Sequence, residues 1–172
     1  MTPPGTVLLL LAGRAAGDLG AAYAWPLPTG EPEPPSLLAA TARRVAALGL
    51  PLCILHHTEE ALPKDALSFD AIAGTAADAL GLVAEAALAL QAAHYVLLDA
   101  RAPLLDLDVL QAGLALHSTH QADYTSNLHP RAMPLGMGVE VVRHGKLLMA
   151  HQALARPSTR QDATGFFTTH FP

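Results

Sequence analysis

Three aspartates in the middle of the sequence, Asp99, Asp106 and Asp108, form a group of carboxylates within ten residues. Carboxylates are ligands for hard cations such as Mg²⁺. The group follows the apolar run 95–98, which is typical of a buried strand. Asp106 and Asp108 also stand where a helix is expected to begin, and there a carboxylate caps the helix and favours its positive end. Capping is the role that we favour for Asp106, with metal binding second.

Histidine and cysteine offer weaker candidates. His117 and His120 are three residues apart, which puts both rings on one face of a helix, and Asp123 follows three residues later. No third ligand is placed by the spacing, so a metal site is not the interpretation that we favour. Cys53, the single cysteine, lies in an apolar run. A buried structural thiol in a reducing, intracellular setting fits it best.

Short apolar runs alternate with longer segments of helical periodicity, and this alternation is typical of an α/β protein with a largely parallel sheet. We predict strands at 6–12, 52–56, 69–73, 95–98 and 139–143. We predict helices from an N-cap at Ser36 to about 48, from a cap at Thr75 to about 92, at 106–117 and at about 145–155. The segment 13–35 is rich in proline and is predicted to be a long loop.

The predicted loop 13–35 and the aspartates are expected to lie on one edge of the sheet. Open α/β sheets bind ligands outside the carboxyl ends of their strands. The loop follows the first predicted strand, and Asp99 follows the fourth. The ligand site is therefore expected at this edge.

Composition excludes several classes of protein. The 172 residues are 51% apolar, which suits one core and a single domain spanning 1–172. Charged residues are 15% and the net charge is −5, so neither a disordered chain nor a nucleic-acid partner is favoured. No stretch has the length and apolarity of a membrane span. The apolar run 7–12 lacks a preceding basic residue, so it is interpreted as a first strand and the protein as cytoplasmic.

Three segments carry a resemblance to a known family: DYTSN at 123–127, PLGMGVEV at 134–141 and RQDAT at 160–164. They resemble the cytidylyltransferases of spore-coat polysaccharide biosynthesis and CMP-sugar synthesis, whose segments read roughly D-Y-x-S-N, P-x-G-L-D-V-E-V and R-E-H-V-T. Upstream, APLLD at 102–106 and GTAADAL at 74–80 are similar to the family's G-D-C-P-L-I-D and G-S-x-x-D-V-L. The resemblance implies a Rossmann-like three-layer α/β/α sandwich, the nucleotide-diphospho-sugar transferase fold of glycosyltransferase-A type. The family is usually longer at its C-terminus, so the chain looks like the nucleotide-binding core.

The resemblance also implies a reaction, in which CMP passes from CTP to a sugar and pyrophosphate is released. Such transfer depends on cationic side chains and Mg²⁺ over the phosphates. The family's basic loop reads roughly A-R-M-G-S-x-R-L-P-G-K, whereas this chain reads AGRAAGDLGAA at 12–22. Asp18 and Ala22 replace the second Arg and the Lys. Arg14, one place out of register, is the cation that remains.

The family's metal-binding positions are altered as well. Its Asp in G-D-C-P aligns with Arg101, and its Asp in G-L-D-V-E aligns with Gly138; neither side chain holds a hard cation. Asp106 and Glu140 do match family positions. Asp99 lies two residues before Arg101, an offset of roughly 7 Å along an extended chain, so its use as a replacement ligand requires a remodelled backbone.

The candidate site residues follow from these comparisons. Asp99, Asp106 and Glu140 are the candidate catalytic residues, and Asp106 and Glu140 the candidate metal ligands. The candidate residues for nucleotide or substrate binding are Arg14, Asp123, Asn127, Arg131 and Arg160. Alternatives stay open: 123–127 as a polar strand edge, Glu140 as the solvent side of a half-buried strand, and both later arginines as solvated surface groups.

Three functions are carried forward. The first is a cytidylyltransferase-like protein of surface-polysaccharide or nucleotide-sugar metabolism whose catalysis is impaired or altered, and which binds CTP or a related nucleotide and an acidic sugar. The second is an active transferase that uses Mg²⁺ as its cofactor. The third is a non-catalytic interaction protein, such as a homodimer formed through the Ala/Leu-rich helices.

Overall fold

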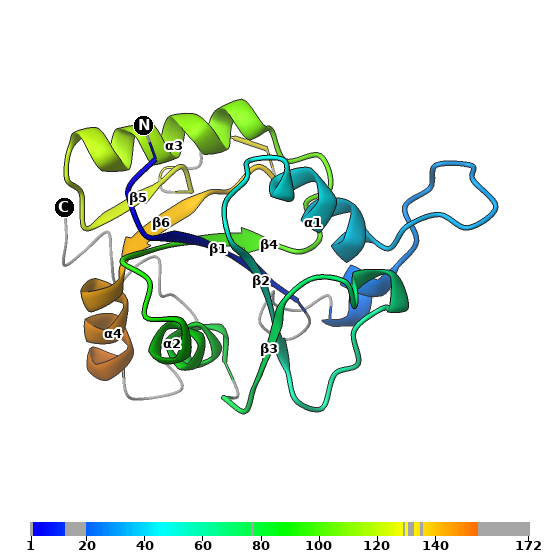
Figure 1. Ribbon diagram of the computed structural model, residues 1–172, viewed down its shortest axis with the longest axis horizontal. Coiled ribbons are helices and arrows are strands. Elements are labelled where there is room, and N and C mark those ends of the chain that lie inside the picture. Colours follow the sequence, from blue (N-terminus) through cyan, green and yellow to red (C-terminus); the bar gives the residue numbers. More distant parts are fainter. Residues whose placement is uncertain are drawn as a thin grey trace.

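The computed structural model describes residues 2–12, 20–76, 78–128, 130, 133–134 and 136–154. Six strands form one sheet with helices on both of its faces (Figure 1). The strands are β1 (Thr6–Leu11), β2 (Leu52–His57), β3 (Ala71–Gly74), β4 (His94–Asp99), β5 (Tyr124–Ser126) and β6 (Glu140–Arg143). The helices are α1 (Leu37–Ala46), α2 (Ala79–Leu90), α3 (Leu107–Thr119) and α4 (His144–Ala153), with short 3-10 turns η2 (Gly20–Ala24) and η3 (Lys64–Ala66).

The sheet has the strand order β3-β2-β1-β4-β6-β5. β3, β2, β1 and β4 run parallel to one another. β6 runs antiparallel to both of its neighbours, β4 and β5. The carboxyl ends of the four parallel strands therefore share one edge with the end of β5 and the beginning of β6. We call this the carboxyl edge, and the opposite one the amino edge.

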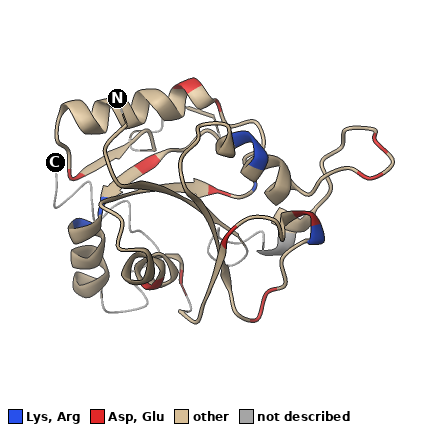
Figure 2. Cartoon of the chain, viewed as in Figure 1, with Lys and Arg blue, Asp and Glu red and all other residues tan. Residues whose placement is uncertain are grey.

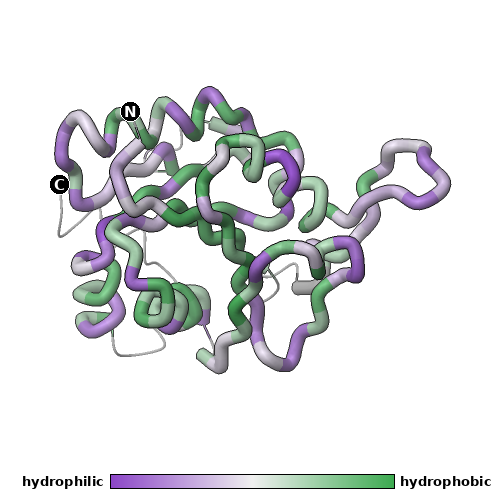
Figure 3. Tube along the Cα trace, in the orientation of Figure 1, coloured by the Kyte–Doolittle hydropathy of each residue, from purple (hydrophilic) through white to green (hydrophobic). Residues whose placement is uncertain are grey.

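Alternate residues along the strands divide the core into two halves. In β1, Leu8 and Leu10 join the cluster under α1 and α3, whereas Leu9 and Leu11 join the cluster under α2 and α4. Because both faces are covered, the central strands are apolar at nearly every position (Figure 3). The predicted three-layer α/β/α sandwich with a mostly parallel sheet is confirmed. No helix in the described part of the chain has the length and apolar run that crossing a membrane requires.

Most element boundaries agree with prediction within two residues, but α2 begins later than predicted. Its N-cap is Asp78, whose Oδ1 accepts a hydrogen bond of 2.8 Å from the Gly81 amide. Thr75 does not cap the helix. Its hydroxyl donates instead to Glu85, and the same carboxylate accepts from the Thr75 amide. The side chain with the better cap geometry therefore lies three residues after the predicted one.

The described part of the predicted loop 13–35 leaves the body of the protein and returns to it. η2 is tied to the chain after β2 by the Tyr23 hydroxyl, which donates to the Ala61 carbonyl at 3.1 Å. A bridge between Pro26 and Ser36 closes the base of the segment that follows, which projects from the molecule (Figure 1). Ser36 then caps α1 as predicted, with its Oγ accepting from the Ala39 amide.

Candidate functional site

The carboxyl edge gathers several of the candidate residues. Asp99 ends β4, and Glu140 begins β6 opposite Leu97. Ser126 at the end of β5 pairs with Glu140, so Asn127 follows at the same edge. Charged residues are sparse over the whole molecule (Figure 2), so each one at this edge matters for what the edge can bind.

Asp99 is held by Arg101. The guanidinium donates from Nε to Oδ1 at 2.9 Å and from Nη2 to Oδ2 at 2.6 Å. The Arg101 backbone amide donates to the same Oδ1 at 2.8 Å. The Arg101 side chain is 18% exposed and that of Asp99 is 41% exposed. These hydrogen bonds raise the pKa of Arg101, with the charge of Asp99 adding to the effect and burial opposing it. The site therefore contains a fixed guanidinium.

Glu140 is held by Tyr124, whose hydroxyl donates to Oε2. Both residues are partly buried. The next two residues, Val141 and Val142, pack into opposite halves of the core, so β6 is covered on both faces. The alternative in which Glu140 lies on the solvent side of a half-buried strand does not describe this arrangement. β6 has a strand on each side and helix layers above and below.

Asp106 is the N-cap of α3, and its Oδ1 accepts from the Asp108 amide at 2.8 Å. The capping role favoured from the sequence is confirmed. Asp108 lies in the first turn and is exposed. A carboxylate that caps a helix keeps part of its acceptor capacity for other partners.

The Leu128 side chain occupies the space that a residue larger than glycine would need at position 138. A Cβ built at this position would lie 2.7 Å from Cδ2 of Leu128. Contacts this short do not occur between real side chains, so the Leu128 side chain has to move before any carboxylate can stand at 138. The packing therefore agrees with the loss of an acidic residue here.

Asn127 closes the base of the segment between β5 and β6. Its Nδ2 donates to the Met137 carbonyl at 2.8 Å, and its Oδ1 accepts from the Val139 amide at 2.9 Å. Both ends of the amide are thus engaged with backbone. Asn127 positions the chain that leads into β6, whatever else it contacts.

Asp123 lies at the amino edge, four residues from Asn127 and therefore roughly 13 Å away along the extended β5. Its carboxylate pairs with Lys146 Nζ at 3.1 Å and with Arg143 Nη1 at 3.6 Å. The structure does not bring Asp123 together with the candidates of the carboxyl edge.

Histidines form a second polar cluster at the amino edge. His117, 1% exposed on α3, has its Nε2 3.1 Å from Nδ1 of His94 and its Nδ1 2.9 Å from the Thr125 hydroxyl. Burial, with smaller contributions from His94 and Arg143, lowers the pKa of His117 to about 4, and Asp123 opposes the shift. Burial and Arg143 also lower the pKa of His94.

His120 does not join His117. It is the C-cap residue of α3 and is exposed. In the described part of the chain, no three His, Cys, Asp or Glu residues gather in an arrangement able to hold a metal ion. Cys53 is buried, and burial raises the pKa of its thiol to about 11, which fits the structural role expected of it.

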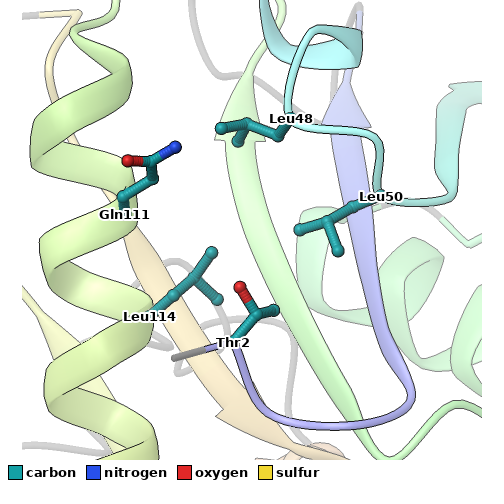
Figure 4. A pocket seen from close by; sticks show the side chains of 5 residues that line it. All are labelled: Thr2, Leu48, Leu50, Gln111 and Leu114. Carbon is teal, nitrogen blue, oxygen red and sulfur yellow. The ribbon is translucent and has the colours of Figure 1, made fainter.

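A small hollow of about 180 Å³ lies between α3, the connection from α1 to β2 and the segment before β1 (Figure 4). Thr2, Leu48, Leu50, Gln111 and Leu114 line it. Because Leu50 and Thr2 precede β2 and β1, the hollow is at the amino edge, away from the candidate site.

Three of the predicted binding residues, Arg14, Arg131 and Arg160, lie outside the described residues. Two partners were not found from the sequence. The sequence indicates only the loss of a metal ligand at Arg101. Because Arg101 follows Asp99 by two residues, however, their side chains are within reach of each other. Tyr124 belongs to the DYTSN motif. Its contact with Glu140 depends on the register between β5 and β6, which no local pattern reveals.

The fold and the site geometry can now be compared with known proteins. The sequence matches no protein-family model and no curated protein. Solved structures do match. The chain is similar to a cytidylyltransferase from Leptospira borgpetersenii serovar Hardjo-bovis, with a TM-score of 0.83 and 19% identity over 97% of this chain and 73% of that one. The protein therefore has the fold of the cytidylyltransferases.

Two further structures extend the comparison. A CMP:2-keto-3-deoxy-manno-octonic acid synthetase, complexed with CTP, has a TM-score of 0.65 and 11% identity over 92% of this chain and 82% of its own. The 2-C-methyl-D-erythritol 4-phosphate cytidylyltransferase from Thermus thermophilus has a TM-score of 0.59 and 14% identity over 100% of this chain and 86% of its own. Identities this low establish the architecture, and the chemistry has to be argued from the site.

Proposed function

We propose that this protein binds a cytidine nucleotide and an acidic sugar at the carboxyl edge, and that its transferase chemistry is impaired or altered. Its setting would be surface-polysaccharide or nucleotide-sugar metabolism in the cytoplasm. The shared fold with cytidylyltransferases supports the nucleotide class, because two of the matching structures are named for cytidine nucleotides as products or substrates. The location is supported by the general rule for open α/β sheets.

The observation that carries the proposal is the pairing of Asp99 with Arg101. The residues that Mg²⁺ would need are engaged with protein groups: Asp99 with the guanidinium, Glu140 with Tyr124, and Asp106 with the start of α3. A cation at Asp99 would also face a positive charge within hydrogen-bond distance of its ligand. As they stand, these residues do not fit a metal ion.

A second candidate, an active Mg²⁺-dependent transferase, is favoured by one relation. Asp99 lies two residues beyond Leu97, and Leu97 faces Glu140. The two carboxylates are thus diagonal neighbours on the same face of the sheet, and such neighbours are about 7–8 Å apart. If Arg101 turned away, Asp99 and Glu140 would be placed to share a cation.

The experiment is pyrophosphate release from CTP with Mg²⁺ or Mn²⁺ against a panel of acidic sugars, beside thermal-shift titrations with CTP and CMP. We expect a shift of the melting temperature with nucleotide and no pyrophosphate above background. Metal-dependent turnover that is lost in Glu140→Gln but kept in the exposed control Asp108→Asn would establish the second candidate instead. Absence of both turnover and a shift would remove both.

A homodimer is part of the proposal for a different reason. Leu88 on α2 and Met149 on α4 are 57% and 48% exposed, and both helices cover the same face of the sheet. Large contiguous patches of exposed apolar side chains mark interaction sites, and the homodimer requires that Leu88 and Met149 belong to one such patch. The mass of the protein in solution, measured by light scattering, decides this: a monomer at high concentration contradicts it.

A further inference from the structure

We infer that Arg101 is the phosphate-binding group of the carboxyl edge, and that Asp99 occupies it as an internal competitor when no ligand is bound. The inference deepens the proposed function and rests on it for the location of the nucleotide. Arg101 stands at the position where the family has a metal ligand. Its guanidinium would supply part of the positive charge that a bound cation supplies to the phosphates.

The first step of the argument is the geometry of the donors. Nε, Nη2 and the backbone amide of Arg101 all donate to one carboxylate, at 2.9, 2.6 and 2.8 Å. A carboxylate presents two oxygens to the fork of an arginine in the same way as a phosphate does. The group of donors is therefore already arranged for a bidentate oxyanion, with Asp99 standing where the ligand's oxygens would be.

The second step is exposure. The Arg101 side chain is 18% exposed, whereas the carboxylate that it binds is 41% exposed and faces solvent. An ion pair with one well-exposed partner is screened by solvent and contributes little to stability. Asp99 is consequently the partner that can be displaced, and Arg101 is the one that stays.

The third step is position. β4 is a central strand of the sheet, flanked by β1 and β6, and Arg101 follows its carboxyl end. Ligands of open α/β sheets bind outside these ends. Asp99 and Glu140 bring negative charge to the same place, so anion binding is weakened while both stay ionised. Removing the charge of Asp99 should therefore strengthen anion binding in metal-free buffer, whereas a metal-ligand role for Asp99 predicts that the same change weakens CTP binding in Mg²⁺.

The test is calorimetric titration of CTP, of inorganic pyrophosphate and of glucuronate into wild type, Asp99→Asn, Arg101→Gln and Arg101→Lys, in EDTA and again in Mg²⁺ without EDTA. We expect Asp99→Asn to bind roughly three- to tenfold more tightly, Arg101→Gln at least about tenfold more weakly, and Arg101→Lys to be intermediate, because lysine keeps the charge without the fork. Asp108→Asn removes the same charge from a neighbouring exposed position, and we expect it to change affinity less than twofold. Melting curves of each variant establish that it is folded.

The outcomes separate this inference from the proposed function. CTP binding that neither Arg101 nor Asp99 affects, or that Asp99→Asn weakens, overturns the inference and leaves the proposed function standing. Arg101-dependent binding of pyrophosphate, with no preference for CTP, supports the inference and overturns the nucleotide assignment. Arg101-dependent binding of glucuronate but not of pyrophosphate places the sugar acid there and overturns the phosphate assignment. If wild type and Asp99→Asn bind none of the three probes, the inference is overturned.

Discussion

The amino and carboxyl edges of the sheet both contain polar side chains that bond to one another, but the two groups differ in burial and in the sequence separation of the partners. At the amino edge, His117 is 1% exposed and bonded at both ring nitrogens, between a helix and two strands. At the carboxyl edge, Asp99 is 41% exposed and pairs with a residue two positions away. The first arrangement joins segments that are distant in sequence, so it stabilises the fold. The second is local and accessible, which is what an exchangeable binding group requires.

The largest expected effect is a loss of unfolding free energy in acid, caused by the histidine cluster at the amino edge. The pKa of His117 is about 4 in the folded protein against an ordinary value of 6.5. Its contribution is present in full above pH 6.5 and is lost as the pH falls toward 4, because over this range the unfolded chain binds a proton that the folded one excludes. We expect a loss of about 3 kcal/mol. Urea unfolding from pH 7.5 to 4 measures it, and His117→Gln should flatten the dependence.

The exposed His120 supplies the control for that experiment. His120→Gln should keep most of the loss of stability that wild type shows between pH 6.5 and 4, because the buried histidine is still present. If wild type and His117→Gln lose the same free energy of unfolding between pH 6.5 and 4, the amino edge is not the structural cluster that we describe.

Asn127 blurs the contrast, since it is a structural residue at the carboxyl edge. Asn127→Ala removes two hydrogen bonds to backbone groups of Met137 and Val139 and should cost about 2 kcal/mol. Asn127→Asp keeps the acceptor for the Val139 amide and should cost about half as much. Thermal unfolding measures both. If Asn127→Ala leaves the stability unchanged, Asn127 has no structural role and remains only a candidate for ligand binding.

The cap of α3 is expected to have a smaller effect. Asp106→Ala loses the hydrogen bond to the Asp108 amide and should cost about 1 kcal/mol, whereas Asp106→Asn should cost less. The free energy of unfolding is measured by chemical denaturation of both Asp106 variants, with Asp108→Ala as the control. Equal losses for the two alanine variants would mean that the charge near the helix start matters and the cap does not.

Asp99→Asn should have the smallest effect on stability. The pair with Arg101 is partly exposed and local, so the free energy of unfolding should change by less than about 0.5 kcal/mol. Denaturant titration at pH 7 is sufficient. A loss of about 2 kcal/mol or more would show that the pair stabilises the fold and would remove the difference between the two edges.

Much of the fold follows from local patterns. The apolar runs of β1, β2 and β4 predict buried strands because both faces of the sheet are covered, and Ser36 and Asp106 were identified as caps from residue type and position. The placement of Asp99 at the carboxyl edge follows from the alternation of strands and helices.

The rest depends on pairings that local sequence does not encode. The contact between His94 and His117 joins residues 23 positions apart, and that between Tyr124 and Glu140 joins residues 16 apart. The motif DYTSN places Asp123 and Asn127 close together in the sequence. In the structure β5 lies between them, so the two residues are at opposite edges of the sheet. A motif that is continuous in the sequence thus combines residues from two separate places in the fold.

The strands at the two borders of the sheet are short: β5 has three residues and β3 has four. A border strand this short presents few unpaired backbone groups to another chain. In the described structure, the sheet is therefore poorly suited to being extended by a strand from a second molecule. Copies of this protein that meet are expected to do so through helix side chains, and the same shortness protects the folded state against aggregation by strand addition.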